Sequence, residues 1–184
     1  MACTLHYLGD FETSGQYAIR GVQLWRSLGA RSPVVGVDNS AVNILCYKAL
    51  FEAHIGEITS SRATMAEAIS LAEELKDMYS LAMALGFAAP LEIAERNLAE
   101  VERYSSDLIE LSTRHHFAHF LAVGSIFRGW ARSVSGDTAE GILCIEQGIR
   151  GIRETGSVLG LPYHLALHAE ALFLADCTSE ALRQ

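Results

Sequence analysis

Two pairs of histidines in this sequence have the spacing of metal ligands on a helix. His115 and His119 are four residues apart, and so are His164 and His168. Because an α-helix turns once in about 3.6 residues, each pair lies on one helical face. A metal site needs a third ligand, and the available ones are His116, Glu170 and Asp176. No HExxH or cysteine-rich pattern joins these residues, so we expect no metal in the chain.

The nucleophilic side chains form no recognisable catalytic pattern. No serine lies in a GxSxG or SxxK arrangement, and no GxxxxGK[ST] phosphate loop is present. Burial in apolar helices raises the pKa of a thiol and suppresses its reactivity, so we expect buried, reduced cysteines. The four scattered cysteines are Cys3, Cys46, Cys144 and Cys177. We therefore expect neither enzymatic activity nor a cofactor.

Composition limits the partners of this chain of 184 residues. It has 14 Lys and Arg against 22 Asp and Glu, a net charge of −8, which argues against binding to nucleic acid or to an anionic membrane. A neutral or basic partner is favoured. The N-terminus lacks a signal peptide, and the longest uncharged run, Met78 to Leu91, is shorter than the roughly 18 residues of a membrane span. These features predict a cytoplasmic protein.

A turn that recurs at regular intervals along the sequence sets the positions of the helices. The turn at 136–138, Gly-Asp-Thr, is followed by small residues at Gly141 and Gly148. Small residues at this spacing are needed where the two helices of a hairpin pack closely. The corresponding turns lie at 9–11, 56–58, 96–98, 136–138 and 176–178. The first interval is longer than the others, and an irregular segment at 29–39 accounts for its extra length.

Apolar periodicity on both sides of each turn predicts helical hairpins. After the turn, residues such as Ile142, Ile145 and Ile149 recur at steps of three and four, as in an amphipathic helix. Before it, nearly continuous apolar stretches predict helices that are covered on several sides. The predicted helices span 2–8, 13–28, 40–55, 59–76, 78–94, 98–115, 118–135, 138–155 and 160–175, with a truncated helix from 178. We expect a single all-α helical-repeat domain over 1–184.

The small residues around the turns resemble those of a tetratricopeptide-type array. Ala89, Gly129 and Ala169 each lie seven positions before the first residue of a turn, the position that Gly136 holds. More closely, the segments GFAA, RGWA, AEGI, GIR and TGSVLGLPYHLALHAEAL resemble the helical repeats that follow the ATPase module in large bacterial class III adenylate or guanylate cyclases and ATPase-linked LuxR-type regulators. The resemblance covers most of the chain. It implies a tetratricopeptide-like α-α superhelix with a scaffold role, and it places any cyclase or ATPase chemistry in other domains.

Two features depart from the tetratricopeptide pattern. The period is about 40 residues, whereas that of tetratricopeptide repeats is about 34. Pro90 occupies the place that Trp130 holds one repeat later, and a proline inside a helix removes a backbone hydrogen bond. We therefore expect a kink between Leu85 and Pro90. The first and last hairpins are also incomplete, so we expect a longer parent protein or self-association through these ends.

The resemblance also implies where a partner would bind. In tetratricopeptide-like arrays the first helices of the hairpins line the concave face, and the groove candidates on them are Met83, Val123, Trp130, Tyr163 and Glu170. Core packing is the favoured alternative for Trp130, which follows Gly129. The leading hypothesis is a non-catalytic protein-interaction or regulatory scaffold in bacterial signal transduction that binds a peptide, a partner domain or a second copy. The alternative is a small-molecule sensor with an apolar pocket between repeats.

Overall fold

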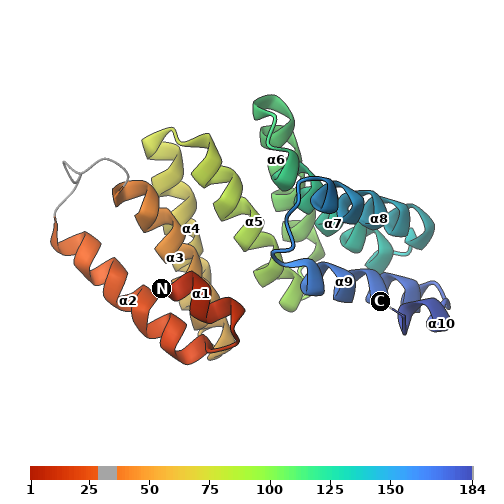
Figure 1. The fold of residues 1–184 in the computed structure, drawn as a ribbon, viewed down its shortest axis with the longest axis horizontal. Helices are drawn as coiled ribbons and strands as arrows, with labels where there is room; N and C mark the ends of the chain where they lie inside the picture. The colour runs from red at the N-terminus through yellow and green to blue at the C-terminus, as the bar shows by residue number, and fades with distance from the viewer. Residues whose placement is uncertain (29–36, 184) are drawn as a thin grey trace. The chain divides into compact units, whose positions relative to one another are not determined.

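The protein is an all-α structure, seen in a computed structural model that describes residues 1–28 and 37–183 (Figure 1). No strand occurs in these residues. The helices are α1 (Ala2–Tyr7), α2 (Phe11–Ser27), α3 (Val37–His54), α4 (Ile58–Leu75), α5 (Met78–Ala94), α6 (Leu98–His115), α7 (Ala118–Val134), α8 (Thr138–Glu154), α9 (Leu161–Leu174) and α10 (Thr178–Ala181). None of the helices in the described ranges has the length and apolar composition to cross a bilayer.

The helix bounds agree with the sequence prediction within two residues, except at the start of α3. The predicted irregular segment at 29–39 lies mostly outside the described residues, because those at 29–36 are not described. Residues 37–39 belong to α3, so the prediction was wrong there. The polar pair Asp38 and Asn39 is as typical of the first turn of a helix as of a loop, and this explains the error.

The chain divides into two compact units, Met1–Leu91 and Glu92–Gln184, and the division falls within α5. In the first unit, consecutive helices from α1 to α4 pack against each other, and α1 also contacts α3. In the second unit, consecutive helices from α6 to α10 pack in the same way, and α7 also contacts α9. Each unit therefore consists of helices that contact their neighbours in sequence and, in places, the helix after next.

The turns predicted between the two helices of each hairpin are confirmed. Gly56, Arg96, Gly136 and Asp176 are evenly spaced in the sequence, and all adopt a left-handed backbone, with φ of 85°, 57°, 102° and 60°. Only glycine adopts this conformation without strain. The repeat therefore imposes the same backbone on Arg96 and Asp176 that glycine accepts freely.

A second series of left-handed residues connects successive hairpins. Lys76, His116 and Gly156 have φ of 53°, 59° and 74°, and their spacing in the sequence equals that of the first series. Because two of the three are not glycine, the residue types at these positions do not predict a left-handed turn. A side chain defines the start of the helix after the first of these turns, because the Asp77 carboxylate accepts a hydrogen bond from the backbone N–H of Ser80 at 3.3 Å. The turn between hairpins therefore recurs with the same period as the turn within each hairpin.

Helices α7 and α8 meet backbone to backbone. A Cβ atom placed on Gly141 would lie 2.5 Å from the carbonyl oxygen of Gly129, and one on Gly129 would lie 2.6 Å from the carbonyl oxygen of Gly141. Further along the pair, a Cβ on Gly148 would lie 2.7 Å from the carbonyl oxygen of Ala122. Only glycine fits at these three positions without a shift of backbone. The small residues that follow the turn at 136–138 are therefore the points at which the two helices touch.

Pro90 lies inside α5, which runs from Met78 to Ala94 as one continuous helix. Pro90 has no backbone N–H to donate within the helix. The expected kink between Leu85 and Pro90 stays a prediction.

Candidate functional site

The candidate site lies in the second compact unit and is built around the carboxylate of Glu170. Trp130, in α7, has no exposed surface, and its indole Nε1 donates a hydrogen bond to Glu170 Oε2 at 2.8 Å. Glu170 lies in α9, 40 residues after Trp130. The two side chains therefore occupy equivalent positions in successive hairpins, and the buried indole fixes one carboxylate oxygen.

The second carboxylate oxygen of Glu170 is held by Arg96. The Nη1 atom of Arg96 forms a hydrogen-bonded ion pair with Glu170 Oε1, and the Arg96 Cζ lies 5.4 Å from the centre of the Trp130 ring. The side chain of Arg96 is 59% exposed and that of Glu170 is 29% exposed. The guanidinium thus covers the buried indole by a cation–π contact and faces solvent on its outer side.

Arg96 is the residue of this site that the sequence did not indicate. It was identified only as part of a turn, and its ion-pair partner lies 74 residues away in the sequence. The left-handed backbone at Arg96 is a second unusual feature, because residues with a side chain rarely adopt it, apart from Asn, Asp and His. The repeat register, which puts Arg96 where Gly56 and Gly136 stand, is the one signal that marks it.

Tyr163 lies at the start of α9, about two helical turns before Glu170 on the same helix. It is 38% exposed, and its ring makes an edge contact with Phe127 at a centroid distance of 6.5 Å. Burial raises the pKa of the Tyr163 hydroxyl above its usual value; the charge of Glu170 raises it further, and that of Arg96 opposes this. The hydroxyl is therefore a neutral donor at neutral pH. We call Arg96, Trp130, Tyr163 and Glu170 the Glu170 cluster.

The remaining two groove candidates lie elsewhere. Val123, in α7, is buried, with 7% of its surface exposed. Met83 belongs to the first compact unit, where the Asn43 side-chain amide donates a hydrogen bond to its sulfur at 3.2 Å. The structure thus brings three of the five candidates together, namely Trp130, Tyr163 and Glu170. Since Trp130 is covered completely, the solvent-exposed part of this cluster consists of Arg96, Tyr163 and Glu170.

The histidine pairs are not arranged around a common metal position. His164 is buried against Phe127, at a centroid distance of 5.9 Å, and burial lowers its pKa to about 4, with a smaller effect from the charge of His119. His168 is also buried, and its Nε2 lies 3.7 Å from a carboxylate oxygen of Glu146. Within the described ranges, no three His, Cys, Asp or Glu residues come together to hold a metal ion.

The cysteines differ from one another in burial. Cys46 is fully buried, and burial raises the pKa of its thiol to about 12, as expected from the sequence. The expectation of burial was wrong for Cys3, which is exposed because it lies in the six-residue helix α1, where no residue is buried. Cys144 and Cys177 are partly exposed. The thiol with the raised pKa is thus the one that solvent does not reach.

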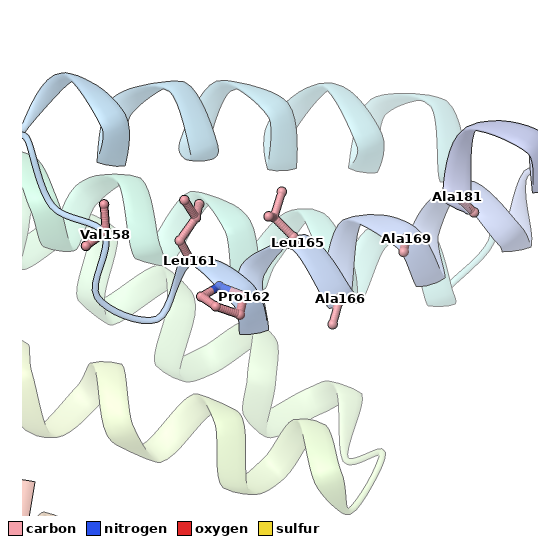
Figure 2. A pocket seen from close by; sticks show the side chains of 7 residues that line it. All are labelled: Val158, Leu161, Pro162, Leu165, Ala166, Ala169 and Ala181. Carbon is pink, nitrogen blue, oxygen red and sulfur yellow. The ribbon is translucent and has the colours of Figure 1, made fainter. Parts of the chain in front are cut away.

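A separate apolar hollow lies along α9. Its volume is about 480 Å³. Figure 2 shows its lining, which consists of Val158 before the helix, Leu161, Pro162, Leu165, Ala166 and Ala169 in α9, and Ala181 in α10. None of these side chains ionises, and neither Trp130 nor Tyr163 is among them. We call this surface the α9 hollow; it supports binding of an apolar group and offers nothing for acid–base chemistry.

Comparison with known proteins gives one relative without an assigned function. No family model matches the sequence. Over 127 residues, which make up 69% of this chain, the sequence is 25% identical to an uncharacterized protein of Rhizobium meliloti (strain 1021). The matched part is 12% of that protein, so the chain spans far less than two thirds of this relative. The chain is thus similar to a short part of a much longer bacterial protein.

Proposed function

We propose that this chain is a non-catalytic protein-interaction scaffold, with a regulatory role in bacterial signal transduction, whose first helices bind a peptide or a partner domain. The Glu170 cluster carries this proposal. It presents hydrogen-bond donors of Arg96 and Tyr163 at the surface, and the buried Trp130 holds the carboxylate that orients Arg96. The resemblance to the repeats of cyclases and LuxR-type regulators supports the regulatory part.

The finer fold on which this function depends is a tetratricopeptide-like α-α superhelix within each unit. Contacts between residues one repeat period apart support it. In the first unit, Tyr47 and Phe87 meet edge to face with ring centroids 5.2 Å apart, and Asn43 contacts Met83. In the second unit, Trp130 contacts Glu170. Equivalent faces of successive first helices therefore lie against each other, as in stacked repeats that present one continuous face to a partner.

The chemistry of the Glu170 cluster favours peptide carbonyls as the groups that bind. The guanidinium of Arg96 carries five N–H donors, and only those on Nη1 are engaged with a carboxylate among the described residues. No hydrogen bond is assigned to the Tyr163 hydroxyl within the same residues. Because the chain has a net charge of −8, a strongly acidic partner is repelled at long range. We therefore propose a neutral or basic peptide whose backbone carbonyls accept from Arg96 and Tyr163, with an apolar side chain against the Tyr163 ring.

A peptide-display selection on the whole chain tests this proposal. Selected peptides are titrated by fluorescence anisotropy against the unchanged chain, Tyr163→Ala and Arg96→Gly; the glycine removes the guanidinium and accepts the left-handed backbone. Because Tyr and Arg are enriched among residues that dominate binding, each variant is expected to weaken binding by about tenfold or more. The control is Leu143→Ala, since Leu143 is an exposed residue of α8. Equal affinity of all four proteins for every selected peptide would contradict the proposal.

The α9 hollow favours the alternative of a small-molecule sensor, because its volume lies in the range of ligand pockets, about 300–1,000 Å³. Specific ligand pockets also contain a few polar groups that fix orientation, and the lining of this hollow contributes none from its side chains. A fragment screen followed by NMR chemical-shift changes distinguishes the two functions. Saturable shifts in α9 that accompany a stabilised fold would favour the sensor.

A further inference from the structure

The hairpins α3–α4 and α7–α8 place equivalent residues in equivalent contacts. Their turn glycines are two repeat periods apart in the sequence, so each residue of the first hairpin has its equivalent two periods later. In α3–α4 the Ser61 hydroxyl donates a hydrogen bond to the carbonyl oxygen of Ala49 at 2.8 Å. In α7–α8 a Cβ atom on the equivalent Gly141 would lie 2.5 Å from the carbonyl oxygen of the equivalent Gly129. The two hairpins can therefore be compared residue by residue.

In the first of these hairpins a cation and a carboxylate neutralise each other. The Lys48 ammonium lies 2.5 Å from Glu52 Oε1, one helical turn later on α3, and it donates to the Thr64 hydroxyl at 2.8 Å. The Ser60 hydroxyl donates to the same oxygen of Glu52 at 2.6 Å. Burial raises the pKa of the Glu52 carboxyl, but the hydrogen bonds from Lys48 and Ser60 outweigh burial and leave this pKa below its ordinary value. The ionised carboxylate therefore balances the charge of Lys48.

The second hairpin keeps the cation but has different groups around it. The residues equivalent to Lys48, Glu52, Ser60 and Thr64 are, in this order, Arg128, Arg132, Glu140 and Cys144. A second cation thus occupies the position at which the first hairpin has a carboxylate, one helical turn after Arg128. The contact to the next helix persists, because Arg132 Nη1 lies 3.6 Å from Glu140 Oε1. These four positions therefore carry two arginines and one carboxylate, with an excess of positive charge.

Arg128 has no anionic partner among the described residues. Its Nε atom is buried, and no described group accepts a hydrogen bond from it. No described carboxylate lies within ion-pair distance of Arg128 either. Buried polar atoms of native proteins almost always have a partner, and a charged group without one destabilises the fold. The unpaired N–H and the excess charge both indicate an acceptor that the described residues do not provide.

We propose that Arg128 and Arg132 form a binding site for an oxyanion, the carboxylate or phosphate group of a small molecule. The oxyanion accepts hydrogen bonds from Arg128 Nε and from the Arg132 guanidinium, and it takes the place that the Glu52 carboxylate has in the first hairpin. Guanidinium groups suit this role because their rigid N–H donors match two oxygens of a carboxylate or phosphate. The partial exposure of Arg128 gives a small molecule access to it.

The charge of the whole chain limits what this site binds. A net charge of −8 repels a polyanion such as nucleic acid at long range. A single oxyanion is affected mainly by the arginines in contact with it, because salt screens the more distant charges. The site shares no residue with the Glu170 cluster or the α9 hollow. It is therefore independent of the proposed peptide binding.

Titration of the whole chain with acetate and with inorganic phosphate, at constant ionic strength, tests the site. The arginine Nε–H resonances are followed by NMR, and that of Arg128 is assigned by its loss in Arg128→Met. We expect saturable shifts of this resonance, together with a melting temperature that rises with probe concentration, because a ligand of the folded state stabilises it. Arg132→Met should weaken binding by at least about tenfold. The matched control, Arg153→Met at an exposed position of α8, should leave the affinity unchanged.

A double variant that copies the first hairpin gives the reciprocal test. Arg132→Glu combined with Glu140→Ser puts a carboxylate one turn after Arg128 and a hydroxyl beside that carboxylate. This variant should bind neither probe, and without any probe it should melt at a higher temperature than the unchanged chain. Saturation by acetate alone or by phosphate alone supports the proposal and identifies the oxyanion. No saturable shift with either probe, or equal affinity of the unchanged chain, Arg132→Met and the double variant, would overturn the proposal.

Discussion

Replacing Gly141 by alanine puts a methyl group where α7 and α8 meet backbone to backbone. The new Cβ would lie 2.5 Å from the carbonyl oxygen of Gly129 and 2.8 Å from the backbone nitrogen of Ser133, whereas ordinary contacts of a Cβ begin at 3.4 Å. Both neighbours are backbone atoms of α7, so no side-chain rotation relieves the contact. We expect the two helices to separate and the free energy of unfolding to fall.

The size of the effect follows from three contributions. Overpacking of this kind costs about 1–3 kcal/mol. The Cβ would also lie 2.2 Å from the Ser133 hydroxyl, which donates to the carbonyl oxygen of Gly129 at 3.0 Å; loss of this hydrogen bond costs about 1 kcal/mol. Alanine has a helix propensity better than that of glycine by about 1 kcal/mol, which acts in the opposite direction. The net expectation for Gly141→Ala is a destabilisation of roughly 2 kcal/mol.

Urea denaturation followed by circular dichroism measures this change, and the melting temperature should fall by roughly 5 °C for a chain of this size. Gly21→Ala is the matched control, because its Cβ would meet only methyl and methylene groups of the Ile44 side chain, the nearest at 3.1 Å, and these can move. The control should be neutral or slightly stabilising. If Gly141→Ala proves as stable as the control, the close approach of α7 and α8 is refuted.

Three further substitutions test separate features of the structure. Trp130→Phe removes the donor to Glu170 and should lower the free energy of unfolding by about 1–2 kcal/mol in urea titrations; no loss would show that the 2.8 Å hydrogen bond contributes nothing. The folded-state pKa of His164, about 4, lies below its ordinary value of 6.5, so the unfolded chain binds the extra proton between these values. Stability should therefore fall as the pH drops from about 6.5 to about 4, by up to about 3 kcal/mol, and His164→Leu should flatten this part of a pH series of denaturation curves; an unchanged slope would contradict the burial of the neutral imidazole. Lys76→Gly places a glycine at φ 53° and should stabilise the fold by a few tenths to about 1 kcal/mol in thermal melts, and a destabilised variant would argue against the left-handed turn.

Much of the fold was accessible from the sequence because helices and tight turns depend on nearby residues. The apolar periodicity after Thr138 and the glycines at Gly56 and Gly136 were enough to place the helices to within two residues at nearly every end. Lys76 and His116 escaped prediction, because they adopt the conformation of glycine without being glycine. Each is the residue that ends a helix, and the backbone N–H that follows it, of Asp77 or Phe117, donates to the carbonyl oxygen of Ala72 or Ser112 in the last turn.

The candidate site was predictable only in part, because its contacts join distant segments. Periodicity and the family resemblance placed Trp130, Tyr163 and Glu170 on first helices, and the equivalence of Trp130 and Glu170 in successive repeats was readable from the sequence. That their side chains meet, and that Arg96 completes the cluster, depends on the stacking of α7 against α9 and on the turn after α5.

By itself, the sequence determined an all-α chain with a regular helical repeat, since the spacing of apolar and small residues acts within one or two helical turns. Only the tertiary structure decided which surfaces are covered. The apolar pattern of a single helix does not distinguish Ile126, which is fully buried, from the exposed Ala166 at the equivalent position of α9. The difference arises because burial depends on the neighbouring helix, and a residue's own helix carries no information about what packs upon it.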